Sequence, residues 1–159
     1  MRVEDILRRK GTRIGTVRIN ETIETALRLL KAENTGALVV KDVCRTEGNT
    51  VVGVISERDI VRGLTDRGPV VLTQPVTALM SRNPVCCGPK DSVRRVLQLM
   101  DEHTIRHVPV LEGASLVGVV SVRDIIKAQL EAAPRDDVDT DGDRADVAEG
   151  WSFPVAANQ

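Results

Sequence analysis

The sequence predicts an α/β fold built from two copies of one small unit. A ten-residue run that begins at Val52 recurs at Val117, 65 residues later, with seven of its ten positions identical. Around each run, apolar residues at helical spacing alternate with short β-rich stretches. A unit of three strands and two helices covers only one face of its sheet. We therefore expect the two units to pack sheet to sheet about a pseudo-twofold axis.

Each copy has the same expected order of elements: a strand, a helix, a hairpin and a second helix. In the first copy these are a strand at 16–19, a helix at 22–33, a hairpin of 37–40 with 51–55, and a helix at 57–64. In the second copy they are 84–87, 92–103, 107–111 with 116–120, and 122–131.

The helix starts and the hairpin turns have local sequence signals. Thr or Ser precedes each amphipathic run and can cap it. The offset between the copies changes from 70 to 65 across residues 41–50, so the first copy has five extra residues there. We expect them in a hairpin loop with a turn at Gly48-Asn49, and a shorter turn at Glu112-Gly113 in the second copy.

The repeat divides the chain into four segments: a first repeat at 1–66, a linker at 67–75, a second repeat at 76–131 and an acidic tail at 132–159. The tail has a net charge of −5, which leaves the body at +4. Residues 137–142 resemble the start of an EF-hand loop, but the twelfth position is Ala148, so we expect disorder instead. Residues 151–155 hold the only aromatic side chains and could be a docking segment.

Composition excludes several classes of function. With one Trp, one Phe and no Tyr, the chain offers no aromatic platform for single-stranded nucleic acid, and its body is far from a basic stripe. No apolar run approaches about 18 residues, and the N-terminus lacks the features of a secretory signal. We therefore expect a cytoplasmic protein with neither a nucleic acid nor a membrane as partner.

Neither the cysteines nor the remaining polar residues indicate catalysis. Cys86 and Cys87 are adjacent and could form a redox switch or half of a metal site; with Cys44 they make an odd count, and we favour ordinary strand residues in a reducing compartment. No nucleophile–base pair, carboxylate pair or metal-ligand cluster emerges. We expect no catalytic residue, no metal ligand and no required cofactor.

The repeated motif is Gly-Val-x-Ser-x-Arg-Asp, at 53–59 and 118–124. Its Gly would let the backbone approach a ligand, and its Ser begins a helix whose free N–H groups favour an anion. The Asp could accept hydrogen bonds from two ribose hydroxyls, while the Arg faces phosphate. Ser-x-x-Asp is also a plain capping box. The recurrence of the whole motif favours a nucleotide site.

The two copies resemble a tandem pair of cystathionine-β-synthase (CBS) domains, a Bateman module, over about residues 1–131. Both copies match the family's Gly-hydrophobic-x-(Ser/Thr)-x-x-Asp signature, and residues 106–110 match its Arg-His-hydrophobic-Pro-Val strand. The resemblance implies a βαββα fold for each repeat. It also implies two clefts between the repeats that take AMP, ADP, ATP, NAD(H) or S-adenosylmethionine.

The resemblance also implies which residues form each cleft. The residues of one cleft would be Ser56, Arg58 and Asp59 with Val85, Arg106, His107 and Pro109. Those of the other would be Ser121, Arg123 and Asp124 with Thr16, Val17, Gly36 and Ala37. Because Gly36-Ala37 replaces Arg106-His107 in the first copy, we expect the first cleft to hold phosphate more strongly.

The function expected from these residues is that of a regulatory module rather than an enzyme. An adenine nucleotide, AMP or NAD(H) above the others, would bridge the two repeats and change their packing, and a regulated protein would respond. The aliphatic faces of the helices after Ser56 and Ser121 suggest a homodimer. The alternative is an interaction or scaffold homodimer whose clefts are vestigial.

Overall fold

The computed structural model describes residues 1–11, 13–44 and 48–134. The helices and strands are α1 (Val3–Lys10), β1 (Thr16–Arg18), α2 (Ile23–Glu33), β2 (Ala37–Cys44), β3 (Gly48–Ser56), α3 (Glu57–Arg67), β4 (Ser81–Arg82), α4 (Val93–Glu102), β5 (His107–Glu112), β6 (Ser115–Ser121) and α5 (Val122–Ala132). Two short 3-10 helices, η1 (Pro69–Thr73) and η2 (Val76–Ala78), lie between α3 and β4.

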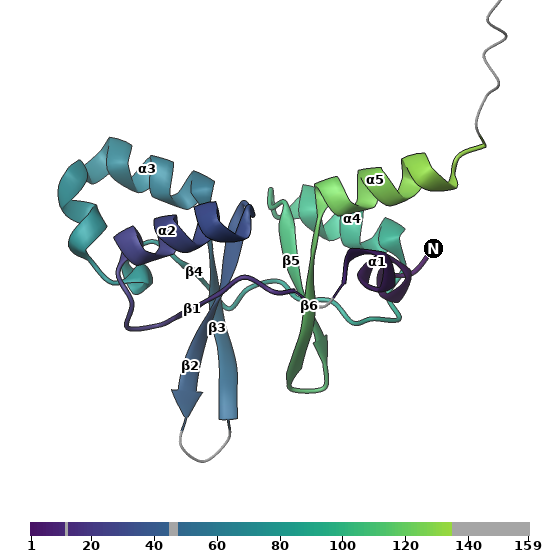
Figure 1. Cartoon of the computed structure of the whole chain (residues 1–159), viewed down its shortest axis with the longest axis horizontal. Coiled ribbons are helices and arrows are strands. Elements are labelled where there is room, and N and C mark those ends of the chain that lie inside the picture. The colour runs from purple at the N-terminus through teal and green to yellow at the C-terminus, as the bar shows by residue number, and fades with distance from the viewer. Residues whose placement is uncertain (12, 45–47, 135–159) are drawn as a thin grey trace, which may run out of the picture.

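Two units lie side by side, and each packs its helices against an antiparallel hairpin, β2–β3 or β5–β6 (Figure 1). In the first unit, β1 runs parallel to β2, and β4 is antiparallel to β3, which makes a four-stranded sheet of order β1-β2-β3-β4. In the second unit, Cys87 forms a single parallel bridge to Val110 beside the hairpin. The α/β fold of two related units is confirmed.

Each unit has its own aliphatic core. The first core is centred on Ile23, Leu38, Ile55 and Ile60, all at most 1% exposed. The second is built around residues at related positions of the repeat: Val93, Val108, Val120 and Ile125. The helices begin at capping side chains, as expected: Thr22 Oγ1 accepts from Thr25 N at 3.2 Å, and Ser92 Oγ accepts from Arg95 N at 3.1 Å.

The segments that lead into the repeats are exchanged between the units. Val3 and Ile6 of α1 lie in the core of the second unit, and Val3 N donates to Asp91 O at 3.0 Å. In return, Val76 lies in the core of the first unit, and its N donates to Glu21 O at 2.9 Å. Each unit therefore needs a segment of the other repeat to complete its core, which ties the two units together.

Gly53 and Gly118 of the repeated motif were expected to let the backbone approach a ligand, and the exchanged segments show that this role is wrong. A Cβ atom at Gly118 would lie 2.6 Å from Leu7 Cδ2, and one at Gly53 would lie 2.7 Å from Ser81 O and 2.9 Å from Met80 Sδ. These glycines therefore make room for the exchanged segments and not for a ligand, because protein atoms already fill the space beside them.

Several boundaries also differ from the expected ones. Gly48 and Asn49 pair with Cys44 and Val43 as part of β3, so the turn expected there is wrong, and the connection falls at 45–47, outside the described residues. The strand expected at 84–87 is reduced to the bridge at Cys87, and the short strand β4, which precedes it at 81–82, pairs with β3 of the first unit. The EF-hand-like run and the aromatic segment of the tail also lie outside the described residues.

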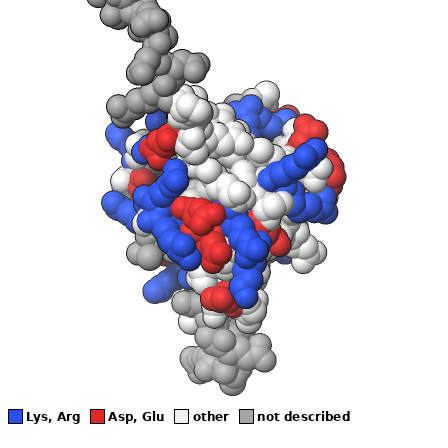
Figure 2. Space-filling view, turned by 90° about the vertical axis from the view of Figure 1, so that its right-hand side faces the viewer, with Lys and Arg blue, Asp and Glu red and all other residues white. Residues whose placement is uncertain are grey.

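On the face of the molecule seen in Figure 2, basic and acidic side chains are not separated into patches of one sign. On the face in Figure 2, basic and acidic side chains lie next to each other around an uncharged area. That face therefore lacks the continuous basic stripe by which proteins track a nucleic acid. Within the described residues, no helix combines the length and the hydropathy that crossing a membrane requires.

Candidate functional site

Two cavities open between the units, and each is lined by the Ser-Asp turn of one repeat together with strands of the other. The larger has a volume of about 1310 Å³ and contains the turn of Ser121 and Asp124. The smaller, of about 490 Å³, contains the turn of Ser56 and Asp59. The predicted pairing of each turn with the opposite repeat is what the structure shows.

At the smaller cavity, the turn after β3 is a complete capping box. Ser56 Oγ accepts from Asp59 N at 3.2 Å, while Ser56 N and Ser56 Oγ both donate to Asp59 Oδ2 at 2.9 Å. Arg58, Arg62 and Arg82 line the same cavity. The arrangement therefore combines a fixed carboxylate with several guanidinium groups.

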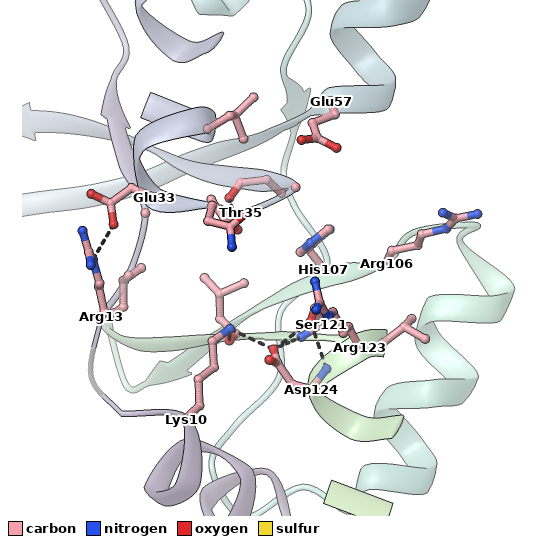
Figure 3. Close-up of a pocket in the computed structure, with 18 of the residues that line it drawn as sticks. Lys10, Arg13, Glu33, Thr35, Glu57, Arg106, His107, Ser121, Arg123 and Asp124 are labelled. Carbon is pink, nitrogen blue, oxygen red and sulfur yellow. Dashed lines mark hydrogen bonds and ion pairs between the residues drawn. The ribbon is translucent and has the colours of Figure 1, made fainter. Parts of the chain in front are cut away.

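At the larger cavity, the turn after β6 has the same geometry and an additional cation (Figure 3). Ser121 N and Ser121 Oγ donate to Asp124 Oδ2 at 2.8 and 2.7 Å. Lys10, the last residue of α1, donates from Nζ to the same Oδ2 at 2.8 Å. Partial burial acts to raise the pKa of Asp124, but the hydrogen bonds from Lys10 and Ser121 outweigh it, so its pKa lies below the ordinary value.

The capping interpretation of Ser-x-x-Asp is thus correct, and it is compatible with a ligand. In both turns, the hydrogen bonds among the described residues reach only Oδ2 of the carboxylate. The second oxygen, Oδ1, keeps its acceptor capacity. The box holds the carboxylate in one orientation at the cavity wall, ready for hydroxyl donors.

A short wall made of five residues separates the two cavities and lines both: Gly36, Ala37, Glu57, Arg106 and His107. The wall is pseudo-symmetric in its backbone, since Gly36 O accepts from Glu57 N and Arg106 O accepts from Val122 N, each at 3.0 Å. A Cβ atom at Gly36 would lie 3.1 Å from His107 Cε1. Because Gly36 has no side chain, the His107 ring can pack against its backbone.

The positions of these wall residues show that the predicted difference in phosphate binding between the two clefts rests on a wrong assignment. That prediction assigned Arg106 and His107 to the first cleft alone, but both residues line both cavities. The larger cavity also has its own cations, Lys10, Arg13 and Lys127 among them. The clefts are unequal chiefly in volume and not in access to Arg106-His107.

Three predicted residues do not line the cavity assigned to them. Pro109 is buried, its carbonyl accepts from Cys87 N, and it lines neither cavity. Thr16 and Val17 instead line a separate depression of about 450 Å³ beside β1 and α2. The remaining predicted residues line the cavity to which they were assigned.

The error at Thr16 and Val17 has a simple cause. The offset of 70 between the copies pairs Val85, which lines the smaller cavity, with Gly15. Gly15 does line the larger cavity, and strict use of the repeat would have found it. A Cβ atom at Gly15 would lie 2.9 Å from Leu38 Cδ2. Gly15 therefore leaves room for Leu38, and a side chain such as that of Val85 would not fit there without a shift of Leu38.

Cys86 and Cys87 lie outside the two cavities. Cys86 and Cys87 are free; burial raises the pKa of both thiols, that of Cys87 to about 12, so neither is a ready thiolate. In the parts of the chain that the structure describes, no group of His, Cys, Asp or Glu has the arrangement of a metal site.

Comparison with known proteins agrees with the repeat. The model of the CBS domain family matches residues 3–66 and 76–131. The CBS domain-containing protein YhcV of Bacillus subtilis is 34% identical over 119 residues, which cover 75% of this chain and 81% of the relative.

Two similar solved structures hold adenosine compounds. CBS domain protein PAE2072 from Pyrobaculum aerophilum, complexed with AMP, has 28% identity and a TM-score of 0.69, covering 84% of this chain and 100% of that one. The CBS domain pair of protein MJ0100, in complex with 5-methylthioadenosine and S-adenosyl-L-methionine, has 25% identity and a TM-score of 0.70, covering 84% and 98%. With two matched repeats, a shared fold and a close relative, this chain belongs to the CBS domain family.

Proposed function

We propose that the chain is a regulatory module that binds an adenine nucleotide in the clefts between its two units. The observation that carries the proposal is the pair of Ser-Asp turns. Each holds a carboxylate with a free oxygen at a cavity formed by both repeats. A vicinal diol such as ribose suits this acceptor, and the arginines beside it suit phosphate. AMP bound to PAE2072 and adenosine compounds bound to MJ0100 support the same ligand class.

Among adenosine ligands, the charges favour those that carry phosphate. Arg106 lines both cavities, and Arg123 lines the larger. Guanidinium groups bind phosphate in a bidentate manner, whereas the sulfonium group of S-adenosylmethionine is itself a cation. AMP and NAD(H) are therefore the preferred ligands, with ADP and ATP as further possibilities.

The proposed output is a change in packing that a partner recognises. A ligand that touches both Ser-Asp turns and the shared wall bridges two units, so it favours the relative placement in which it makes most contacts. Val61 of α3 and Ile126 and Leu130 of α5 are between 51% and 72% exposed, which suits a homodimer through these helices. We place this module in the cytoplasm, acting on a regulated protein and without catalysis of its own.

Calorimetric titration with AMP tests the proposal. The variants are Asp59→Asn and Asp124→Asn, because the amide oxygen can still accept the capping hydrogen bond while the charge for ribose is lost. Asp66→Asn, on the exposed part of α3, is the matched control. We expect each site variant to weaken AMP binding by about tenfold or more at its own cavity, and the control to bind like the unchanged chain. Unaltered binding in the double variant would refute the site.

The second candidate is a scaffold homodimer with vestigial clefts. The exposed aliphatic side chains on α3 and α5 favour it, and both capping boxes are complete without any ligand. A thermal-shift panel of AMP, ADP, ATP, NAD⁺ and NADH separates the two functions, because a ligand that binds the native state raises the unfolding temperature. Stabilisation by none of them would favour the scaffold.

A further inference from the structure

We infer that Lys10 is the residue that selects an anionic ligand in the larger cavity. This inference rests on the proposed function and adds to it a contact that lies outside the repeated motif. Lys10 is the C-terminal residue of α1, and its Nζ reaches from that helix to the Ser-Asp turn after β6 (Figure 3). It joins the exchanged segment directly to the binding site.

The position of the ammonium group is fixed by two acceptors. Lys10 Nζ donates to Val119 O at 2.9 Å and to Asp124 Oδ2 at 2.8 Å. An ammonium has three N–H donors, so one remains for a ligand. The Lys10 side chain is 32% exposed, against 78% for Arg13, which is paired with Glu33. Both residues line the cavity with an ion-pair partner, but the Lys10 side chain is the less exposed of the two and is fixed beside Asp124.

The arrangement of Asp124 and Lys10 allows the ribose and the phosphate of one nucleotide to bind side by side. Lys10 and Ser121 occupy Oδ2 of Asp124, and Oδ1 stays free for ribose. A phosphate that follows the ribose would lie within reach of the third N–H of Lys10. Lys31, Arg106, Arg123 and Lys127 also line this cavity, and none of them has an ion pair within the described structure. Lys10 is exposed as they are, but two hydrogen bonds fix its ammonium group beside Asp124.

Among the described residues that line the smaller cavity, none is the equivalent of Lys10. Val3 and Val76 occupy matching positions, and so do Thr16 and Cys86, so the first copy's lead-in segment is three residues longer. Accordingly α1 spans eight residues and η2 only three. The extra length extends α1 as far as Lys10. Within the described residues, no lysine or arginine pairs with Asp59. Lys10 thus distinguishes the two clefts chemically, beyond their volumes.

The test is calorimetric titration of the full chain at low salt, in an Asp59→Asn background that weakens the smaller cavity. The variants are Lys10→Met, which keeps the aliphatic stem, and Lys10→Arg, which keeps the charge. Arg8→Met is the matched control, because Arg8 lies on the same helix with a side chain that is 74% exposed and lines neither cavity. The probes are AMP, adenosine and inorganic pyrophosphate.

We expect Lys10→Met to weaken AMP and pyrophosphate by about tenfold, to leave adenosine unchanged, and to be partly rescued by Lys10→Arg. Equal losses for AMP and adenosine, or no loss for AMP, would overturn the inference while leaving the proposed function standing. Lys10-dependent pyrophosphate binding without any AMP binding would refute the adenine ligand and retain the anion role. Failure of all three probes to bind would overturn both.

Discussion

His107 lies on the wall between the cavities, and its protonation should control stability. Burial lowers the pKa of His107 below its ordinary 6.5, and the positive charges of Lys10 and Arg106 act in the same direction, against the opposing effect of Asp124. The folded state therefore resists protonating this ring. Since the unfolded chain takes up the proton more readily, folding stability must fall as the pH drops below the unfolded pKa.

Thermal unfolding measured between about pH 7 and pH 5 tests this effect. We expect His107→Gln to flatten the loss of unfolding temperature over that interval. His103→Gln, at the exposed end of α4, should leave the slope as it is. A slope that is unchanged by His107→Gln would show that another group is responsible.

Glu57 is the residue of the wall with the wrong charge for phosphate. It lines both cavities, and the matching position of the second repeat is Val122. Removing its charge should strengthen AMP binding by about two- to fivefold, the effect of one partly screened charge. The comparison is Glu57→Gln against Glu24→Gln, an exposed acid of α2 that lines neither cavity. Weaker binding by Glu57→Gln would mean that the carboxylate contacts the ligand.

The contacts of the exchanged segments stabilise the association of the two units. Leu7 of α1 fills the place beside Gly118, and Met80 with Ser81 fills the place beside Gly53. The neighbour at Gly118 is a flexible side chain, while at Gly53 it includes a backbone carbonyl. Gly53→Ala should therefore destabilise the fold more than Gly118→Ala, with costs within the range of about 1–3 kcal/mol for overpacking.

A double-mutant cycle in denaturant measures the contact directly. Leu7→Ala should relieve part of the cost of Gly118→Ala, because it removes the atoms that the new methyl group meets, and it should relieve none of the cost of Gly53→Ala. Independent, additive effects of Leu7→Ala and Gly118→Ala would contradict the packing of α1 against β6.

The sequence predicts most of the helices and strands, because their signals are local. Helices with apolar faces and Ser or Thr caps carry a local signal, so α2 and α4 differ from the expected ranges by only one residue at an end. The exchange of α1 and η2 was not predictable, because an apolar face does not specify which of two similar cores it enters. Lys10 was missed for the same reason: only the exchange brings it to Asp124.

For the whole molecule, the exposed aliphatic side chains on α3 and α5 should form an interface between copies of the chain. Leu130 is 72% exposed and Ile126 51%, and burying them would remove apolar surface from water. We expect Leu130→Glu, alone or with Ile126→Glu, to shift a dimer to monomer in sedimentation velocity. Val43→Glu, at a strand residue that is 58% exposed, should leave the mass unaltered. A monomer in the unchanged chain would refute the homodimer.

Because the protein has two unequal clefts between its two exchanged units, the number of AMP molecules that each chain binds is the decisive measurement. Native mass spectrometry of the chain with excess AMP should show up to two AMP molecules per chain, one after either Asp59→Asn or Asp124→Asn, and none after both. The occupancy that survives in Asp59→Asn should depend on Lys10, because the larger cavity then remains. AMP retained by the double variant, or no AMP bound by the unchanged chain, would show that the two Ser-Asp turns do not form nucleotide sites.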